Sequence, residues 1–496
     1  MLEQGGQHIG ANDIDWLVDR VVERLLCGEA RSAADRTPTV SGGVSSTRAP
    51  TSGEGLAPVP RRPGIFDSVQ QAVTAAREAQ KGFVGLSVAT RKKIIAEVRN
   101  TMRAHVDELS RLAVEETGLG RYEDKRNKNL LVIEKTPGIE CLEATAYTGD
   151  DGLCLIEYSA FGVIGSITPT TNPSETVINN GIGMIAAGNA VVFNPHPSSK
   201  RVSNRTVELF NEAIMKAGGP PNVVCSIADP TIETAGELMK AEGIRLLVVT
   251  GGPAVVKAAM NSGKKVIAAG PGNPPVVVDE TADLEQAAKG IIAGASLDNN
   301  IVCIAEKEII VVAEVADRLI AELKKHGAYQ LTSQQMTQLE KIVIDGNYPN
   351  KKFVGKNANV ILREIGVQVG DDVRLVFGEV REESHPFMQV EMLMPVLPLI
   401  RVRNVDDAIA MAKRVEHGFC HTAVMYSKNI DNLHRMACEV NTSIFVKNAP
   451  SYAGLAFGGE GYTSFTIASP TGEGLTTARD FSRVRRCTLK EHFRIV

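Results

Sequence analysis

The stretch Ser296-Leu-Asp-Asn-Asn-Ile-Val-Cys303-Ile-Ala-Glu-Lys-Glu-Ile-Ile-Val-Val312 places one cysteine between a polar run and a β-branched run. The polar run is Asp298 to Asn300, and the β-branched run is Ile309 to Val312. This pattern is typical of a thiol at the mouth of a core strand. Such a cysteine is either inert core or a nucleophile, since a thiolate attacks an aldehyde and holds the oxidised product as a thioester. Motifs elsewhere in the chain decide between the two.

The composition describes an ordinary globular protein of more than one packed unit. The chain has 496 residues, 43% hydrophobic and 23% charged, with a formal net charge of -4. This length exceeds one ordinary core. Scattered Lys and Arg give no reason to expect nucleic acid, and no apolar run reaches the roughly 18 residues that a membrane span needs. The eight cysteines have no paired spacing, so we expect no metal site and a reducing, cytoplasmic setting.

The first 63 residues differ from the rest. Apolar residues recur on one face of a predicted helix within residues 1–28, capped by Asn12 or Asp13 and ended by Gly28. They are Ile14, Leu17, Val18, Val21, Val22, Leu25 and Leu26. Residues 29–63 are rich in Ser, Thr, Gly, Pro and Ala and are predicted to form a flexible linker. A short amphipathic helix on a tether is expected to dock on a partner; the alternative is a helix folded back on its own domain.

From residue 65 onward, strand-like and helix-like segments alternate, which predicts an α/β fold with parallel sheets and right-handed crossovers. The predicted helices are 67–83, 90–117, 175–187, 203–217, 233–241 and 254–261, and the predicted strands are 152–160, 162–168, 190–194, 223–227, 246–250 and 276–279. A second α/β series is expected from about residue 283, with strands at 309–312, 394–402 and 422–426. We expect ligands of such sheets beyond the carboxyl ends of the strands.

Two loops sit between a predicted strand and a predicted helix. In Thr168-Pro-Thr-Thr-Asn-Pro173, the amide of Asn172 can donate to a developing oxyanion; the alternative is a Pro-flanked turn that happens to hold Asn. In Val249-Thr-Gly-Gly-Pro253, two glycines let the backbone approach a pyrophosphate at a helix N-terminus. A plain tight turn is an equally good account of that loop. Gly270-Pro-Gly-Asn-Pro-Pro275 is a further backbone-exposing loop.

Several ordered segments together resemble the aldehyde dehydrogenase superfamily over residues 65–496, and more closely its coenzyme A-acylating branch, the propionaldehyde and acetaldehyde dehydrogenases of bacterial microcompartments. The matching segments are Ile164-Gly-Ser-Ile-Thr-Pro-Thr-Thr-Asn-Pro173, Ala186-Ala-Gly-Asn-Ala-Val-Val192, Asn299-Asn-Ile-Val-Cys-Ile-Ala-Glu-Lys-Glu308, His385-Pro-Phe387, Glu391-Met-Leu-Met-Pro395 and Ser469-Pro-Thr-Gly-Glu-Gly474.

The resemblance implies a role for individual residues. Cys303 matches the nucleophile, Asn172 the amide of the oxyanion hole, and Glu391 the carboxylate that binds the nicotinamide ribose. The implied cofactor-binding set is Thr168, Pro169, Thr170, Asn194, Pro195, His196, Pro197, Thr250, Gly251, Gly252, Pro253, Val256, Gly270, Glu391 and Leu393. The implied cofactors are NAD and coenzyme A, with no metal.

Two departures from the family pattern are informative. Hydrolytic members carry a glutamate, the base that activates water, where this chain has Ala268 in Ala268-Ala-Gly-Pro271. The acyl-enzyme should therefore wait for another nucleophile, and a coenzyme A thiol reacts as its thiolate without that base. The lysine that precedes the ribose-binding proline is replaced by Asn194, which leaves the choice between NAD and NADP open.

The resemblance also implies a domain organisation. Two Rossmann-like parallel-sheet domains are expected, a cofactor-binding domain at 64–140 and 161–268 and a catalytic domain at 269–484. Residues 141–160 and 485–496 should form a β-arm for oligomerisation, since an unpaired tail strand is an aggregation hazard unless a partner covers it. A homodimer or homotetramer is expected. The helix within 1–28 resembles an encapsulation helix that targets such enzymes to a microcompartment shell protein.

The expected function is oxidation of a short aliphatic aldehyde, propionaldehyde or acetaldehyde, by NAD and coenzyme A to the acyl-CoA. One alternative is a hydrolytic aldehyde dehydrogenase, in which His385, His417 or His421 would replace the missing base. A second is an acyl-phosphate reductase of the same fold. A third is a microcompartment scaffold with a vestigial site, against which the set of Asn172, Cys303 and Glu391 argues.

Overall fold

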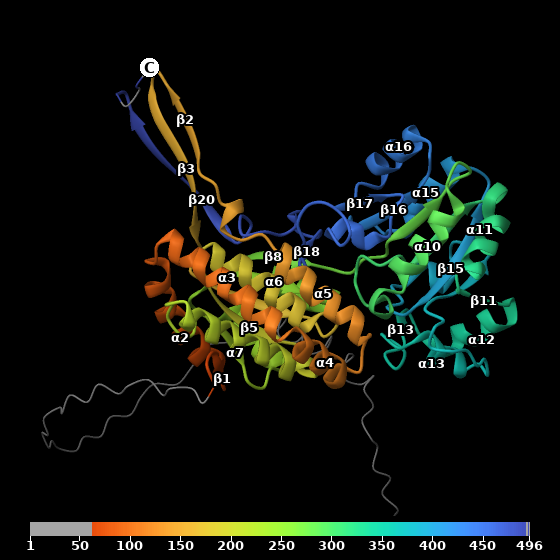
Figure 1. The fold of residues 1–496 in the computed structure, drawn as a ribbon, viewed down its shortest axis with the longest axis horizontal. Coiled ribbons are helices and arrows are strands. Elements are labelled where there is room, and N and C mark those ends of the chain that lie inside the picture. Colours follow the sequence, from red (N-terminus) through yellow and green to blue (C-terminus); the bar gives the residue numbers. More distant parts are fainter. Residues whose placement is uncertain (1–61, 493–494, 496) are drawn as a thin grey trace, which may run out of the picture. The chain divides into compact units, whose positions relative to one another are not determined.

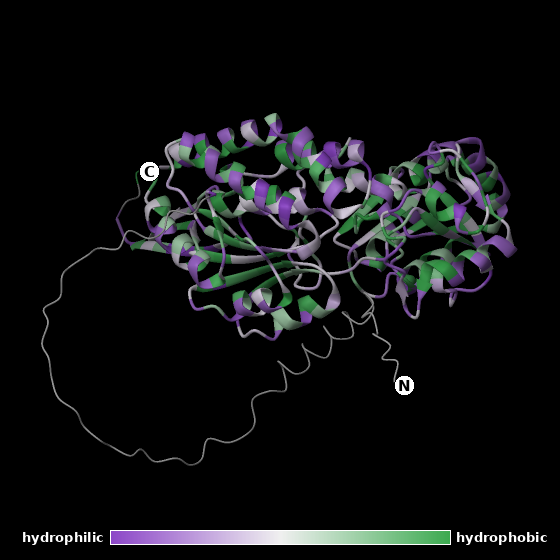
Figure 2. Ribbon diagram, turned by 90° about the horizontal axis from the view of Figure 1, so that it is seen from below, coloured by the Kyte–Doolittle hydropathy of each residue, from purple (hydrophilic) through white to green (hydrophobic). Residues whose placement is uncertain are grey.

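The computed structural model describes residues 62–492 and 495 (Figure 1). The expected N-terminal helix lies outside the described residues, as does the linker as far as residue 61. The described residues form an α/β fold with two parallel sheets, so the predicted fold class is confirmed. In Figure 2, apolar strands lie between helices that turn their polar sides outward.

The first sheet is parallel, and its central strands are buried at every position, as expected of a sheet covered on both faces. Its order is β1-β6-β5-β4-β7-β8, made of β1 (Ile65–Phe66), β4 (Val163–Thr168), β5 (Ala190–Pro195), β6 (Val224–Ile227), β7 (Ile244–Thr250) and β8 (Lys265–Ala269). Its helices are α2 (Val69–Val84), α3 (Val88–Ala104), α4 (Val106–Thr117), α5 (Tyr122–Lys135), α6 (Pro173–Ala186), α7 (Lys200–Lys216), α8 (Ile232–Lys240) and α9 (Pro253–Met260).

The second sheet is parallel too, with the order β11-β14-β15-β10-β9-β16-β17. Its strands are β9 (Pro275–Val278), β10 (Glu308–Val312), β11 (Tyr329–Leu331), β14 (Val376–Val380), β15 (Val396–Val402), β16 (Thr422–Tyr426) and β17 (Ile444–Lys447). Its helices are α10 (Leu284–Ala295), α11 (Ala313–Lys325), α12 (Ser333–Val343), α13 (Ala358–Arg363), α14 (Pro386–Gln389), α15 (Val405–Val415) and α16 (Ile430–Val440), and the 3₁₀ turn η3 spans Leu297–Asn300.

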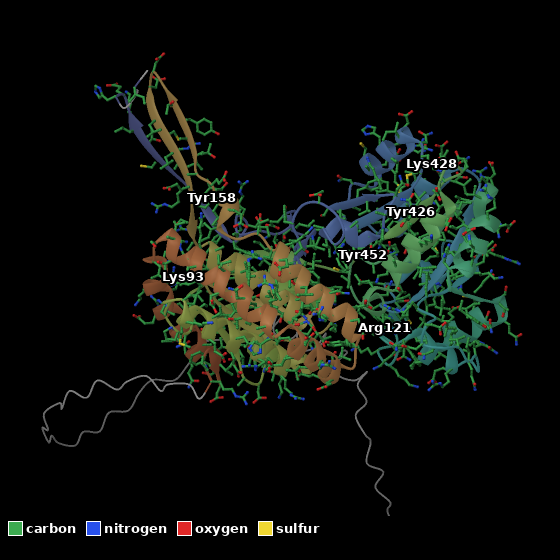
Figure 3. All side chains as sticks on the ribbon, in the orientation of Figure 1. Lys93, Arg121, Tyr158, Tyr426, Lys428 and Tyr452 are labelled. Carbon is green, nitrogen blue, oxygen red and sulfur yellow. The ribbon has the colours of Figure 1, made fainter. Side chains whose placement is uncertain are left out.

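An antiparallel sheet of order β2-β3-β20 forms an arm that projects from the first sheet (Figure 1). Its strands are β2 (Thr145–Gly149), β3 (Gly152–Ala160) and β20 (Ser482–Lys490), so the tail strand begins three residues before the expected 485. Tyr147, Val484 and Leu489 are exposed on this arm. Figure 3 labels Tyr158, on β3. A largely exposed ribbon that carries apolar side chains of this kind favours pairing with another chain.

The prediction of a single helix over residues 90–117 is wrong. It is two helices, because His105 has φ -106° and ψ 12° and serves both as the end of α3 and as the start of α4. The ring nitrogen Nδ1 of His105 lies 2.6 Å from Glu108 Oε2, which holds the break. The strand expected at 276–279 follows the first series in the sequence pattern, whereas the resemblance includes it in the catalytic domain at 269–484. β9 pairs with β10 and β16 and so belongs to the second sheet. The pattern also missed β8 and α5.

Candidate active site

Chemistry-bearing residues lie at the carboxyl ends of three neighbouring strands in the first sheet. β4 ends at Thr168, β5 at Pro195 and β7 at Thr250, and these strands are adjacent in the order β5-β4-β7. The backbone N–H of His196 donates to Thr168 O at 3.1 Å, which ties the first two loops together. This is the edge at which an open parallel sheet is expected to bind ligands.

The second sheet contributes the opposite edge. The loops that enter β9, β10, β15 and β16 carry Gly272, Cys303, Glu391 and His421, and these four strands are neighbours in the order β15-β10-β9-β16. The nucleophile candidate therefore lies before the amino end of its strand. Since neighbouring parallel strands start at the same edge, residues from four distant segments converge there.

The turn before Cys303 has an unusual backbone. Asp298, Asn299 and Asn300 have φ values of 49°, 53° and 67°, three consecutive left-handed residues. Asp and Asn tolerate this region better than most side chains. The Asn300 amide donates to Ala295 O at 2.7 Å and Glu306 O at 2.9 Å, and buried Lys307 donates to Asn300 O at 3.0 Å. The polar run noted in the sequence is therefore the turn that presents Cys303.

The Cys303 side chain is half-buried, and its surroundings keep the sulfur protonated. Burial, followed by the Glu391 carboxylate, raises the pKa of the Cys303 thiol to about 12, against the opposing charges of Lys307 and Lys128. These interactions place Glu391, Lys307 and Lys128 in electrostatic range of one sulfur. A cationic ligand bound beside Cys303 would favour its thiolate, which is the reactive form.

Asn172 lies at the N-terminus of α6, at the end of the loop that leaves β4, and is buried. Lys128 Nζ donates to Asn172 Oδ1 at 2.5 Å. The Asn172 nitrogen Nδ2 donates to Thr171 Oγ1 at 3.2 Å. Lys128 also contacts Asp298, five residues before Cys303, so one cation links the two predicted catalytic segments.

Gly272 lies where Cys303, His421 and Glu391 come close together. A Cβ at this position would lie 2.8 Å from Cys303 O and 3.0 Å from Cγ of His421, so only glycine fits. The Gly272 N–H donates to Glu391, whose pKa is nevertheless raised by burial. In the sequence, Gly272 is marked only as part of a backbone-exposing loop, because close approach of backbones leaves no pattern that a single sequence reveals.

Of the three histidines considered as replacement bases, His421 lies beside Cys303. Its Nδ1 is 2.9 Å from Thr422 Oγ1, and its buried Nε2 has no hydrogen-bond partner among the described residues. Burial and the Lys307 charge lower the pKa of His421 to about 4, so its ring is neutral at pH 7. His385 caps α14 and faces Glu340, and His417 contacts Gln389 O.

The residues predicted to bind cofactor on the first sheet form one band. The hydroxyls of Thr168 and Thr170 are buried without a partner among the described residues, and Pro169 lies between them. Asn194 Oδ1 accepts from Thr234 Oγ1 at 2.7 Å. Pro195 pairs with Thr168 across β5 and β4, and exposed His196 and Pro197 follow it.

The remaining predicted cofactor residues surround the start of α9. Thr250 Oγ1 is 2.9 Å from Thr466 Oγ1, and half-exposed Gly251 leads to Gly252 and Pro253, which open the helix. Val256 in the first turns is half-exposed. Gly270 packs against Pro470, and Leu393 has φ 51° and accepts from Gly355 N at 2.9 Å.

This band fits a dinucleotide. No side chain caps the start of α9, so its first backbone N–H groups are free to bind an anion. The space beside Gly252 is open, since a Cβ there would meet nothing within 4 Å. The hydroxyls of Thr168 and Thr170, which have no partner among the described residues, can form hydrogen bonds with a ligand. Glu391, to which the resemblance assigns a ribose, lies in electrostatic range of Cys303 at the edge of the second sheet.

Ala268 is fully buried on β8, and its N–H donates to Thr471 Oγ1 at 3.0 Å. No side chain at this position can remove a proton from water. Within residues 62–492, no cluster of His, Cys, Asp or Glu that could hold a metal is found. In the part of the chain that the structure describes, no helix has the length and apolarity of a membrane span.

The fold and this convergence on one cysteine define the class of protein. The aldehyde dehydrogenase family model matches residues 41–342 and 374–479, and the chain belongs to that family.

Within this family, the chain is similar to individual proteins and solved structures. The chain is 52% identical over 440 residues to acetaldehyde dehydrogenase (acetylating) EutE of Escherichia coli, covering 87% of this chain and 94% of the relative. Propionaldehyde dehydrogenase of Rhodopseudomonas palustris, solved with bound CoA and an acylated cysteine, superposes with a TM-score of 0.85 at 50% identity over 86% of this chain and 98% of that one. A propionaldehyde dehydrogenase from the fucose utilisation microcompartment of Clostridium phytofermentans gives 0.86 at 47% identity, over 88% and 100%.

Proposed function

We propose that this chain oxidises a short aliphatic aldehyde with NAD and coenzyme A to the acyl-CoA, through an acyl-Cys303 thioester. The observation that carries the proposal is a presented cysteine in a chain whose family base is missing. Cys303 follows the turn at the edge of the second sheet, while buried Ala268 stands at the sequence position where hydrolytic members of the family carry the glutamate that activates water.

The residues have distinct roles in this reaction. The Cys303 thiol first releases its proton to solvent, which a cationic cofactor beside it would favour. The thiolate then forms a bond to the aldehyde carbon, and the resulting oxyanion accepts hydrogen bonds from Asn172 Nδ2 and from the Cys303 backbone N–H. The carbon then loses its hydride with the electron pair, and the carbonyl re-forms as a thioester on Cys303. A bound nicotinamide would supply the hydride acceptor. Thr168, the Gly251–Gly252 turn and Glu391 would orient that cofactor.

The second half of the reaction releases Cys303. The coenzyme A thiolate adds to the thioester carbon, and Cys303 leaves as its thiolate. The proton of the incoming thiol needs no enzyme base, because a coenzyme A thiol reacts as its thiolate once that proton has passed to solvent. His421 lies by Cys303, but its pKa of about 4 makes it a weak proton acceptor, and His385 and His417 face other partners.

The rival functions each lack support from the site. A hydrolytic enzyme needs a base aimed at water, and Ala268 provides none. An acyl-phosphate reductase shares the fold and the cysteine, but of the relatives reported above one is named as acetylating and another was solved with bound CoA and an acylated cysteine. A scaffold with a vestigial site would have no reason to keep Cys303, Asn172 and Glu391 together.

The setting of the enzyme is part of the same proposal. The arm of β2, β3 and β20 exposes Tyr147, Val484 and Leu489, which a second copy would cover in a homodimer or homotetramer. The relative from a fucose utilisation microcompartment supports a place inside such a compartment in the cytoplasm. The amphipathic segment within residues 1–28 would then bind a shell protein.

The test follows NADH absorbance after enzyme, NAD and propionaldehyde are mixed, with and without coenzyme A. We expect a burst of about one NADH per site that resumes on adding coenzyme A, because acyl-Cys303 waits for a thiol. Acetaldehyde in place of propionaldehyde ranks the two substrates. Steady NADH formation without coenzyme A would mean that water is activated, and the role given to Ala268 would then be wrong.

A further inference from the structure

Two lysines on α5 are buried completely between the two sheets. Lys125 and Lys128 lie one helical turn apart, with side chains 0% and 1% exposed. Both reach the same atom, Asp298 Oδ2, at 2.8 Å and 2.5 Å. Burying an ammonium group costs free energy unless the group is paired, and even a buried ion pair adds little net stability. The burial of these two lysines therefore needs an explanation other than stability.

The two lysines differ in their remaining contacts. Lys125 Nζ donates to the backbone carbonyl of Thr171 at 2.8 Å. Lys128 Nζ instead donates to the side-chain oxygen Oδ1 of Asn172 at 2.5 Å and forms an ion pair with Glu175 Oε1 at 3.1 Å. Lys128 is thus the one of this pair that touches the functional group of Asn172.

This contact fixes which end of the Asn172 amide faces the reaction. An amide can flip and exchange its oxygen with its nitrogen, but an ammonium has only donors. The oxygen must therefore face Lys128, which turns the nitrogen Nδ2 away from it. Nδ2 donates to Thr171 Oγ1, and its second N–H is left for a ligand. Burial opposes the Lys128 charge, but Asp298 and Glu175 outweigh it and raise the pKa of Lys128, so the ammonium persists.

The other end of the contact holds the Cys303 turn. Asp298 is the first of the three left-handed residues, and its Oδ1 accepts from the Arg121 N–H at 2.8 Å. The Asp298 N–H donates to Asp124 Oδ2 at 3.0 Å. Figure 3 shows Arg121 at the start of α5, on the side toward the second sheet. The turn that presents Cys303 is therefore anchored to the same helix that orients Asn172.

We propose that Lys128 is a positioning residue for the oxyanion site. It orients the Asn172 amide with its nitrogen toward the substrate, and through Asp298 it aligns that nitrogen with the Cys303 backbone N–H contributed by the other sheet. This inference deepens the proposed function and rests on it.

A double-mutant cycle tests the inference on the pre-steady-state NADH burst, with Lys128→Met, Asn172→Ala and the double variant. Loss of one oxyanion donor costs roughly 10²–10³-fold, and we expect Lys128→Met to slow the burst by about 10–100-fold. In the Asn172→Ala background the same change should slow the burst by a clearly smaller factor, because the oriented group is already gone and only the contact with Asp298 remains to be lost. The KM for NAD should not change in step with the rate.

Lys125→Met is the matched control, since it removes a buried lysine from the same helix and the same Asp298 oxygen. Its effect on the burst rate should be the same factor with and without Asn172→Ala. Equal factors for Lys128→Met in the two backgrounds would overturn the inference. An unchanged burst in Asn172→Ala alone would instead overturn the oxyanion assignment in the proposed function.

If Lys128→Met does not fold, Lys128→Arg and Lys128→Gln keep the inference testable. Arginine has only donors and should keep the burst within about fivefold of wild type, whereas glutamine can donate or accept and no longer fixes the amide. A glutamine variant as fast as the arginine variant would contradict the proposal. Melting temperatures of both variants separate loss of orientation from loss of folding.

Discussion

The two sheets of this protein are built alike but present opposite ends to the site. The first offers the carboxyl ends of β4, β5 and β7, the common ligand edge of open α/β sheets. The second offers the amino ends of β9, β10, β15 and β16, where the chain enters the strands.

In the proposed function, this difference assigns most cofactor contacts to the first sheet and the nucleophile to the second, with Asn172 and Glu391 as the exceptions. The first sheet's edge has a helix N-terminus and free hydroxyls, which suit a dinucleotide, and its α9 loop has an ordinary backbone, with φ -67° at Gly252. The loops of the second sheet hold non-glycine residues at positive φ, at 298–300, Leu393 and Cys420. Backbone strain of this kind collects where a reactive side chain must be held in one position.

The largest effect should come from the nucleophile. Cys303→Ser removes the thiolate, and we expect the NADH burst to fall by on the order of 10³-fold or more. The matched control is Cys420→Ser, since Cys420 is another half-buried cysteine on the same edge, directly before His421. Stopped-flow absorbance measures both. Retained turnover in Cys303→Ser would end the assignment of chemistry to the second sheet.

The glycine loops of the two sheets should respond differently to alanine. In Gly272→Ala the new Cβ would lie 2.8 Å from Cys303 O, so the nucleophile must shift, at a cost of about 1–3 kcal/mol in stability and about 10–100-fold in burst rate. In Gly252→Ala the Cβ meets nothing within 4 Å. That variant should fold normally and weaken NAD binding severalfold, by blocking close approach of the pyrophosphate.

Burst kinetics, NAD titration and thermal melts distinguish these outcomes. If Gly252→Ala slowed the burst at saturating NAD as much as Gly272→Ala does, this assignment of cofactor contacts and nucleophile to different sheets would be wrong.

The smallest expected effect is on the pKa of the Cys303 thiol in the enzyme without cofactor. The Glu391 carboxylate helps to raise the pKa of Cys303, so Glu391→Gln lowers that pKa and increases the thiolate fraction at any pH below it. Iodoacetamide should alkylate the variant about two- to fivefold faster at pH 9, a change of less than one pKa unit. Glu308→Gln is the control, because Glu308 is another buried carboxyl in range of Lys307, and burial raises its pKa. Slower alkylation of Glu391→Gln would reverse the sign of this interaction.

Sequence periodicity predicted much of the fold but missed the helix that organises the site. α5 buries Lys125, Lys128 and Asn129 along with its apolar residues, so no apolar stripe marks it. Its lysines are buried because Asp298 and Glu175, distant in the chain, neutralise them. A pattern that scores hydrophobic residues cannot find a helix whose buried face is ionic.

The sequence by itself determined the fold class, the nucleophile candidate, the amide candidate and the absence of a base at Ala268, because these depend on residue identity and local order. Tertiary structure alone decided that β9 pairs between β10 and β16, that His421 and not His385 or His417 lies by Cys303, and that Lys128 touches Asn172. These depend on strand order and on contacts such as Lys128 with Asp298, 170 residues apart, which periodicity within one segment does not encode.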